Sequence, residues 1–138
     1  MTIEDVQLIK LPKFLDARGN LSFIEQLNHI PFEIKRTYWI YDVPGGENRG
    51  GHAFIQNEEF IVAISGSFDV IVDDGEQKKL FTLNRSYYGL YVPAGIWREM
   101  NNFSTNSLAL EFGSIHYDKQ DYIRDYAEFL KMKRDGKV

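Results

Sequence analysis

The feature that most constrains this chain is a series of short strand-like segments separated by turn signals. The segments cover residues 6–11, 21–26, 33–41, 60–65, 68–72, 79–83, 89–92 and 107–112. Gly66-Ser67 and Asp73-Asp74-Gly75 lie between neighbouring segments and are typical of hairpin connections, because glycine and aspartate tolerate positive φ angles. The glycine-rich stretch 44–51 is predicted to be a loop. Many short strands at nearly regular spacing predict a β-sandwich or barrel.

The C-terminal part of the chain changes from a strand period to a helical one. Its apolar residues Tyr122, Tyr126, Phe129 and Leu130 recur at i, i+4, i+7 and i+8. This spacing is typical of an amphipathic helix that packs one face on the body of the protein. Asp118 precedes the pattern and is predicted to cap the helix. The sequence therefore predicts an all-β fold with one C-terminal α-helix.

The segment 33–41 carries charged and aromatic side chains in alternation. With a period of two, Arg36 and Tyr38 share one face with Ile34 and Ile40, and the residues between them point the other way. If this face points inward, it lines a polar cavity. A chain that contains 14% aromatic residues fits strands around such a lined cavity better than a helical bundle.

Length and composition limit the class of protein further. A chain of 138 residues is the size of one compact domain, so we expect a single domain over residues 1–138. A formal net charge of −4 argues against non-specific nucleic-acid binding, which depends on neutralising phosphates. The sequence shows neither a signal-peptide pattern nor a long apolar stretch. We therefore expect no membrane partner. The chain has no cysteine, which fits a reducing compartment, and we expect a cytoplasmic protein.

Two separated segments resemble the two motifs of cupin-type β-barrels, which bind a metal through His-x-His, then Glu, and a later His. The first segment holds His52, Phe54 and Glu58 at these positions, and the second, residues 89–101, holds Arg98. Phenylalanine cannot coordinate a metal, and a guanidinium stays protonated without a free lone pair. The sequence therefore predicts a cupin-type jelly roll without a metal site.

Seven motifs spread over nearly the whole chain narrow this resemblance. They lie at residues 14–19, 34–43, 49–53, 65–70, 89–93, 95–100 and 121–126. Together they resemble the dTDP-4-oxo-6-deoxyglucose 3,4-ketoisomerases, metal-independent cupins that make precursors of 3-amino sugars for bacterial surface polysaccharides. The resemblance implies a dTDP-linked keto sugar as the partner and no cofactor. The related dTDP-sugar 3,5-epimerases share the barrel and the Asp-x-Arg-Gly element, but not the other motifs in this form.

The resemblance assigns catalytic roles to two residues. Moving a ketone from C4 to C3 requires taking a proton from C3, passing through an enediol and returning a proton to C4. A neutral imidazole can carry such protons at physiological pH. His52 matches the first histidine of the family's pair and is the expected proton carrier. Tyr38 is expected to donate a hydrogen bond to a sugar oxygen.

The resemblance also assigns four arginines to the substrate. A diphosphate needs cations, and the planar fork of arginine suits phosphate oxygens. Arg18, in the Asp-x-Arg-Gly element, and Arg49, beside the Gly-Gly pair, are expected to contact the nucleotide or its diphosphate. Arg36 and Arg98 are expected to line the substrate pocket.

Phe54 departs from the family pattern, because a second histidine is expected there to share the acid and base work. Glu111 stands where a strand would carry an apolar residue, so it either replaces the missing base or faces solvent. Three functions therefore remain open. They are an active 3,4-ketoisomerase or close variant, a related nucleotide-sugar epimerase, and an impaired paralogue that binds dTDP-sugar or pairs with an intact ketoisomerase.

The resemblance further implies a homodimer in which an N-terminal strand is exchanged between protomers. The chain opens with an extended segment, residues 6–11, which agrees with this arrangement. Such a segment would otherwise leave an exposed edge.

Overall fold

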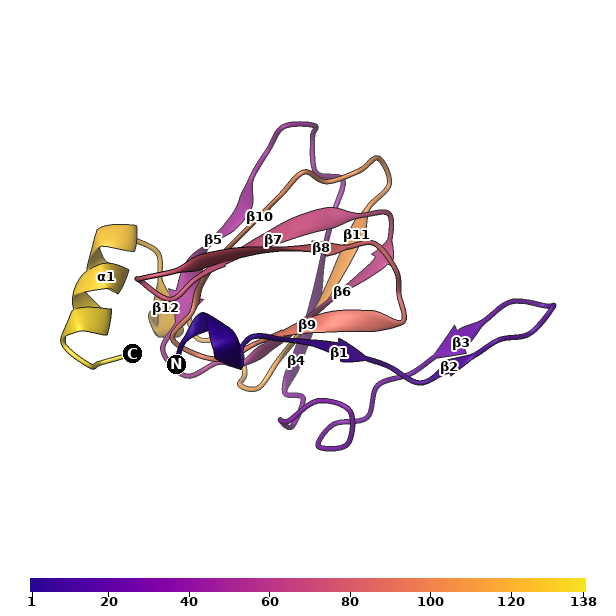
Figure 1. The fold of residues 1–138 in the computed structure, drawn as a ribbon, viewed down its shortest axis with the longest axis horizontal. Helices are drawn as coiled ribbons and strands as arrows, with labels where there is room; N and C mark the ends of the chain where they lie inside the picture. Colours follow the sequence, from indigo (N-terminus) through magenta and orange to yellow (C-terminus); the bar gives the residue numbers. More distant parts are fainter.

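A computed structural model describes all residues 1–138, which form two five-stranded antiparallel sheets and one C-terminal helix (Figure 1). The strands are β1 (Gln7–Lys10), β2 (Lys13–Phe14), β3 (Leu21–Ser22), β4 (Arg36–Tyr41), β5 (Arg49–Phe54), β6 (Glu59–Ser65), β7 (Phe68–Asp73), β8 (Lys78–Leu83), β9 (Tyr88–Val92), β10 (Trp97–Asn101), β11 (Leu108–Gly113) and β12 (Tyr122–Ile123). One sheet has the order β1-β9-β6-β11-β4, and the other has the order β12-β5-β10-β7-β8. This is the predicted cupin-type β-sandwich with a C-terminal helix.

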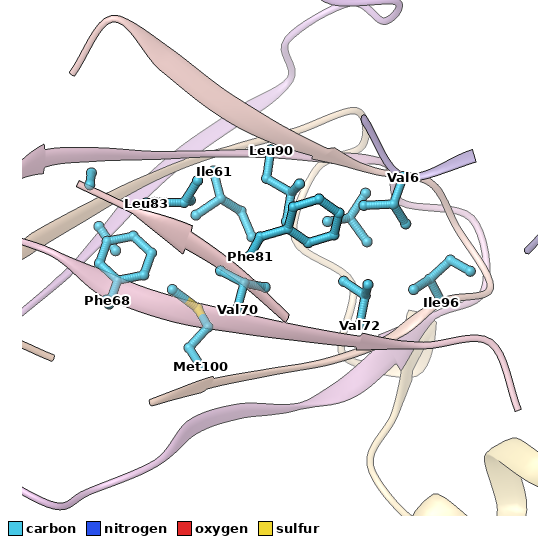
Figure 2. Close-up of a cluster of buried hydrophobic side chains, with 13 residues drawn as sticks. Val6, Ile61, Phe68, Val70, Val72, Phe81, Leu83, Leu90, Ile96 and Met100 are labelled. Carbon is cyan, nitrogen blue, oxygen red and sulfur yellow. The ribbon is translucent and has the colours of Figure 1, made fainter. Parts of the chain in front are cut away.

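The apolar core lies between the two sheets (Figure 2). The largest cluster includes Val6, Ile61, Phe68, Val70, Val72, Phe81, Leu83, Leu90, Ile96 and Met100. Complete burial of one such side chain contributes about 1.5–3 kcal/mol, so this cluster is a main source of the attraction between the sheets. Along β6 the inward face continues from Ala63 and Ile61 to Glu59, and along β11 from Ala109 to Glu111. A polar site therefore begins where the apolar core ends.

The strand β5 begins earlier than the sequence indicates. Residues 49–51 were expected to belong to a loop, but they pair with β10 and extend the sheet. Gly50 has a φ angle of 79°, and the register between the two strands shifts between Arg98 and Met100. The loop prediction was wrong here because this glycine-rich sequence forms a bulged strand, a position where glycine supplies the positive φ angle. The strand β10 was also missing from the predicted set.

The C-terminal helix α1 spans Tyr126–Arg134, and the side chain of Asp125 caps it by accepting a hydrogen bond from the backbone of Ala127. Asp118 caps only a short 3-10 turn, so the predicted helix start was wrong. The chain between these turns pairs with β5 as β12, which removes Tyr122 from the helix. Phe129 of α1 is buried against Trp97. The helices of this structure include no candidate for a membrane-spanning segment.

The strands β2 and β3 form a hairpin that extends away from the sandwich (Figure 1). The strand predicted for residues 21–26 is only two residues long in this hairpin. Phe14 and Leu21 face each other across it and are 59% and 58% exposed. The hairpin therefore presents apolar side chains that nothing in the same chain covers.

Candidate active site

A hollow of about 470 Å³ lies where β4 of one sheet meets β5, β10 and the residues around β12 of the other. Its walls are formed by Tyr38, Trp39, Ile40, Asn48, Arg49, Gly50, His52, Arg98, Tyr122 and Arg124. The set includes four of the six residues that the sequence predicted for the site. As predicted, the Arg36 and Tyr38 face of β4 is the less exposed face of the strand.

Arg98 is fully buried and stands at the centre of a polar network. Its Nε and Nη2 atoms donate to the two carboxylate oxygens of Glu59 at 2.9 and 2.6 Å, which is a bidentate ion pair. Nη2 also donates to Glu111 at 2.7 Å and to the Tyr38 hydroxyl at 3.3 Å. Nη1 donates to the backbone oxygen of Gly50 at 3.2 Å. The guanidinium is therefore held by contacts on four strands.

The network contains two carboxyl groups for one guanidinium. Burial alone would raise the pKa of Glu59, but the charge and hydrogen bonds of Arg98 outweigh it and lower the pKa to about 2. Burial raises the pKa of Glu111 to about 8, although Arg98 opposes this, and the nearby Glu59 charge adds to the rise. Burial and the two carboxyls also raise the pKa of Tyr38. At neutral pH, Glu59 is therefore ionised, while Glu111 and Tyr38 hold their protons.

His52 lies directly opposite Arg98 in the β5–β10 pair. Burial lowers the pKa of His52 to about 3, and the positive charge of Arg98 lowers it further than burial alone would. Its Nε2 atom is buried and has no hydrogen-bond partner. A neutral imidazole on the wall of a hollow can accept a proton from a bound molecule.

Phe54 follows His52 on the same face of β5 and is only 3% exposed. Its ring centroid lies 4.7 Å from that of His52 and 4.6 Å from that of Tyr122, in edge-on arrangements. The third pair of this group, His52 and Tyr122, is 5.0 Å apart. These aromatic contacts fix the orientation of the imidazole, and Phe54 itself is not on the wall of the hollow.

Two of the predicted substrate arginines lie outside the hollow. Arg36 donates to the Tyr122 hydroxyl at 3.2 Å, and its guanidinium lies 5.1 Å from the centre of the Tyr38 ring. Arg18 lies in the loop of the β2–β3 hairpin, is 89% exposed and pairs with Asp16 at 2.7 Å. Arg36 therefore contacts two lining residues of the hollow without lining it itself, whereas Arg18 lies on the separate hairpin.

The glutamate of the first cupin motif is Glu59, whereas the sequence pointed to Glu58. Glu58 accepts a hydrogen bond from Tyr91 instead, and it is less buried than Glu59. Strand alternation could have found the right residue, because Glu59 has the same parity as the core residues Ile61 and Ala63. The prediction followed the motif spacing, which allows either glutamate.

Glu111 does not face solvent, so that alternative was wrong. It is fully buried, and it directly faces Tyr38 in the β11–β4 pair. Sequence reasoning missed Arg124 and placed Tyr122 in the packing face of the helix. Arg124 follows β12, and its guanidinium lies 4.4 Å from the centre of the Tyr122 ring. Only the short strand β12 brings these two residues to the hollow, and no periodic pattern marks a strand of two residues.

The site differs chemically from a metal-binding cupin. No group of three or more His, Cys, Asp or Glu side chains is placed to hold a metal ion. The motif positions carry His52, Phe54, Glu59 and Arg98, and the guanidinium occupies both oxygens of the glutamate. Fold and site together define a cupin-type sandwich with a buried arginine and a neutral histidine at its open end.

Comparisons with known proteins narrow this class to one family. The family model described as FdtA (WxcM-like, C-terminal) matches residues 4–134. A TDP-4-oxo-6-deoxy-α-D-glucose 3,4-oxoisomerase from Aneurinibacillus thermoaerophilus is 42% identical over 91% of this chain and 90% of its own. The chain belongs to the FdtA family and is an isomerase of the 3,4-ketoisomerase type.

Solved structures agree with this assignment. A 3,4-ketoisomerase from Helicobacter canadensis is 40% identical, with a TM-score of 0.92 over 95% of this chain and 98% of its own. A mutant 3,4-ketoisomerase from Thermoanaerobacterium thermosaccharolyticum, solved with TDP-4-keto-6-deoxyglucose, is 32% identical. Its TM-score is 0.92, and the match covers 95% of both chains.

Proposed function

We propose that this protein converts dTDP-4-oxo-6-deoxyglucose, or a close variant, into the 3-oxo isomer. The observation that carries the proposal is the neutral His52 on the wall of the hollow, which Tyr38 and Arg98 also line. The relatives named above support the choice of substrate, because one bears this sugar in its name and another was solved with it bound.

In the proposed reaction, His52 takes the proton from C3 of the sugar, and the C4 oxygen gains negative charge. The Tyr38 hydroxyl, supported by Arg98 at 3.3 Å, stabilises this oxygen in the enediol. His52 then returns its proton to C4 as the ketone forms at C3. The low pKa of His52 makes it a weak base, but its imidazolium is a strong acid for the second transfer.

The nucleotide is proposed to run out of the hollow along the edge of β4. Arg49 and Arg124 supply positive charge for the diphosphate at the wall. A second hollow of about 450 Å³ shares Arg49, Asn48 and Trp39 with the first and continues beside Tyr41. The exposed aromatic rings there offer flat surfaces for the base. Direct substrate contacts of Arg36 and Arg98 remain predictions.

The predicted homodimer gives Arg18 a role that one chain alone does not. The β2–β3 hairpin carries Arg18 at its loop and exposes Phe14 and Leu21. If the hairpin packs on a second protomer, its apolar side chains are covered and Arg18 can approach the partner's nucleotide. Residues 7–10 pair with β9 of the same chain in this structure, and exchange of an N-terminal strand, the homodimer and the cytoplasmic location stay predictions.

Turnover of dTDP-4-oxo-6-deoxyglucose in heavy water tests the proposed function. We expect a 3-oxo product by NMR, with deuterium at C4 to the extent that the His52 imidazolium exchanges its proton with the solvent before returning it. The second candidate, an impaired paralogue that only binds dTDP-sugar, is favoured by Phe54, which cannot transfer a proton. Binding of dTDP without exchange or product would support that candidate and reject the isomerase.

A further inference from the structure

We infer that Glu111 is the second proton-handling group of this site and that it acts on the substrate through the Tyr38 hydroxyl. Glu111 is then a positioning residue in the sense that it never touches the sugar, while Tyr38 does. The substrate in this inference rests on the proposed function. The relay itself comes from contacts in this chain and from the replacement at Phe54.

The sheet register holds the two groups together. Glu111 of β11 and Tyr38 of β4 are direct cross-strand partners, and the Tyr38 hydroxyl lies 3.2 Å from Oε1 of Glu111 and 3.0 Å from Oε2 of Glu59. Tyr38 lines the hollow, whereas Glu111 is fully buried and does not. Because Tyr38 lies between the carboxyl and the hollow, it is the hydrogen-bonded link by which a proton on Glu111 can reach a bound sugar.

The hydrogen bonds of Arg98 decide which carboxyl keeps a proton. Glu59 takes two of them, at 2.9 and 2.6 Å, whereas Glu111 takes one at 2.7 Å. The second oxygen of Glu111, Oε2, is buried and has no partner. An ionised oxygen without a partner is costly to bury, and a protonated carboxyl avoids that cost. The shift in the pKa of Glu111, to about 8, agrees with this assignment.

His52 transfers only the carbon-bound proton, and the relay transfers the protons of the two sugar oxygens. As His52 takes the C3 proton, Tyr38 gives its proton to O4 and receives the proton of Glu111, which yields the neutral enediol. As His52 returns its proton to C4, O3 gives its proton to Tyr38, and the proton of Tyr38 goes back to Glu111. The C3–H bond breaks, the C4–H bond forms, and each protein group ends as it began. Adjacent O3 and O4 atoms make one phenol sufficient.

Phe54 explains why this chain needs a proton-transferring group other than a second histidine. A site with two histidines has two groups that can hold a proton, and here the second position is an apolar ring 4.7 Å from His52. A carboxylic acid that is kept neutral inside the protein can serve as the missing donor and acceptor.

The test compares Glu111→Gln, Tyr38→Phe and the double variant by kcat, KM and pH profile. Glu111→Gln should lower kcat by about 10²-fold or more, in the range of general acid–base catalysis, with little change in KM. The double variant should be no slower than Tyr38→Phe, because both changes remove one relay. Glu58→Gln is the matched control, since Glu58 accepts from Tyr91 in an equivalent pair outside the site, and its kcat should be unchanged.

The pH profile separates a relay from a structural role. The titratable or charged groups that face Glu111 are Tyr38 on β4, Glu59 on β6 and Arg98 on β10, with His52 on β5 beyond the guanidinium. Of these, Glu111 is the group expected to lose its proton near pH 8. The wild type should therefore lose activity above that pH, and this limb should be absent from the residual activity of Glu111→Gln. A limb retained at the same pH would overturn the inference.

Two further measurements test the relay if Glu111→Gln does not fold or if the protein does not turn over the proposed substrate. If Glu111→Gln does not fold, Tyr38→Phe must lose the same alkaline limb, and its retention would reject the relay. Infrared difference spectra near neutral pH should show a protonated carboxyl band that disappears as the pH rises through about 8. This band does not depend on turnover. A wild-type protein without activity would therefore contradict the proposed substrate, while the band would still test whether Glu111 holds a proton. Absence of the band would reject the relay.

Discussion

The ring of Phe54 lies edge-on to the imidazole of His52, with 4.7 Å between the two ring centroids. This contact holds the imidazole in place and keeps water from one side of it. Water exclusion removes solvation from the charged imidazolium, which is the largest cause of the low pKa of His52. The replacement of the second histidine by Phe54 therefore alters the histidine that remains.

Restoring a histidine at this position should not improve the enzyme. In Phe54→His, an imidazole replaces an apolar ring in a buried site, so we expect a loss of about 1–3 kcal/mol in the free energy of unfolding. The relay through Tyr38 already supplies the second proton, so kcat should not rise. Phe54→Leu serves as the apolar control. A tenfold gain in kcat for Phe54→His alone would show that the missing histidine limits the chemistry.

Removing the remaining imidazole should stop turnover and spare binding. We expect His52→Asn to lower kcat by about 10²–10⁴-fold, because it removes the group that carries the carbon-bound proton. Affinity for dTDP, measured by calorimetry, should change little, since Arg49 and Arg124 remain. His116→Asn is the control, because His116 is exposed and is not part of the hollow. Equal activity of the two variants would contradict the role of His52.

Acid should destabilise the protein at pH values at which His52 of the folded protein is still neutral. The folded-state pKa of about 3 lies below the ordinary value of 6.5, so the unfolded chain binds this proton more readily. The stability contribution is complete above pH 6.5 and is lost as the pH falls toward 3, by at most about 1.4 kcal/mol per pH unit. Between pH 5 and 7, kcat/KM should show no limb near 6.5. The free energy of unfolding of His52→Asn should fall less than that of the wild type over this range.

Gly50 should tolerate no side chain. Its φ angle is 79°, and a Cβ atom there would collide with Nη1 of Arg98, whereas Gly46 has a φ angle of 84° and open space around it. Gly46→Ala should therefore cost only the backbone strain, about 1 kcal/mol. Gly50→Ala should cost several kcal/mol more, because Arg98 must leave a buried network. Chemical unfolding of both variants measures the difference, and equal losses would show that the collision is relieved without cost.

The hairpin should control the oligomeric state. Phe14→Asp places a charge on an apolar surface that the predicted homodimer covers, so we expect a monomer in sedimentation equilibrium. Leu80→Asp is the matched control, because Leu80 is 54% exposed on β8 and is not part of the hairpin. A dimer that survives the change at Phe14 would argue against packing of the hairpin on a second protomer.

Local patterns were sufficient for much of the fold and for the inward face of the site. Alternation along β4 placed Arg36 and Tyr38 on the less exposed face, because a strand has only two faces and one is covered. Turn residues located most of the hairpins for the same local reason. The two cupin-type motifs indicated that His52 and Arg98 belong to one site, and the structure pairs them across β5 and β10 although they lie 46 positions apart in the sequence.

The remaining site features depend on contacts between distant parts of the chain. Glu111 could not be judged from its own strand, since only the buried Arg98 makes an inward carboxyl favourable. Tyr122 left the helical pattern because pairing with β5 competes with the helix. The proposed contact of Arg18 with a substrate requires a second protomer, and the structure of one chain does not include that geometry.

The buried guanidinium has a consequence for how this site can change over generations. Arg98 is paired with the ionised Glu59, is hydrogen-bonded to the neutral Glu111, and fits only because Gly50 has no side chain. Loss of Arg98 or Glu59 leaves an unpaired buried charge, a side chain at position 50 collides with the guanidinium, and loss of Glu111 removes a hydrogen-bond partner from it, so single steps away from this arrangement are costly. A descendant that gained a metal-binding histidine at position 98 would have to replace its neighbours together. Substitution at any of these four positions therefore depends on the residues at the other three. The cation of the site is a side chain of the protein itself.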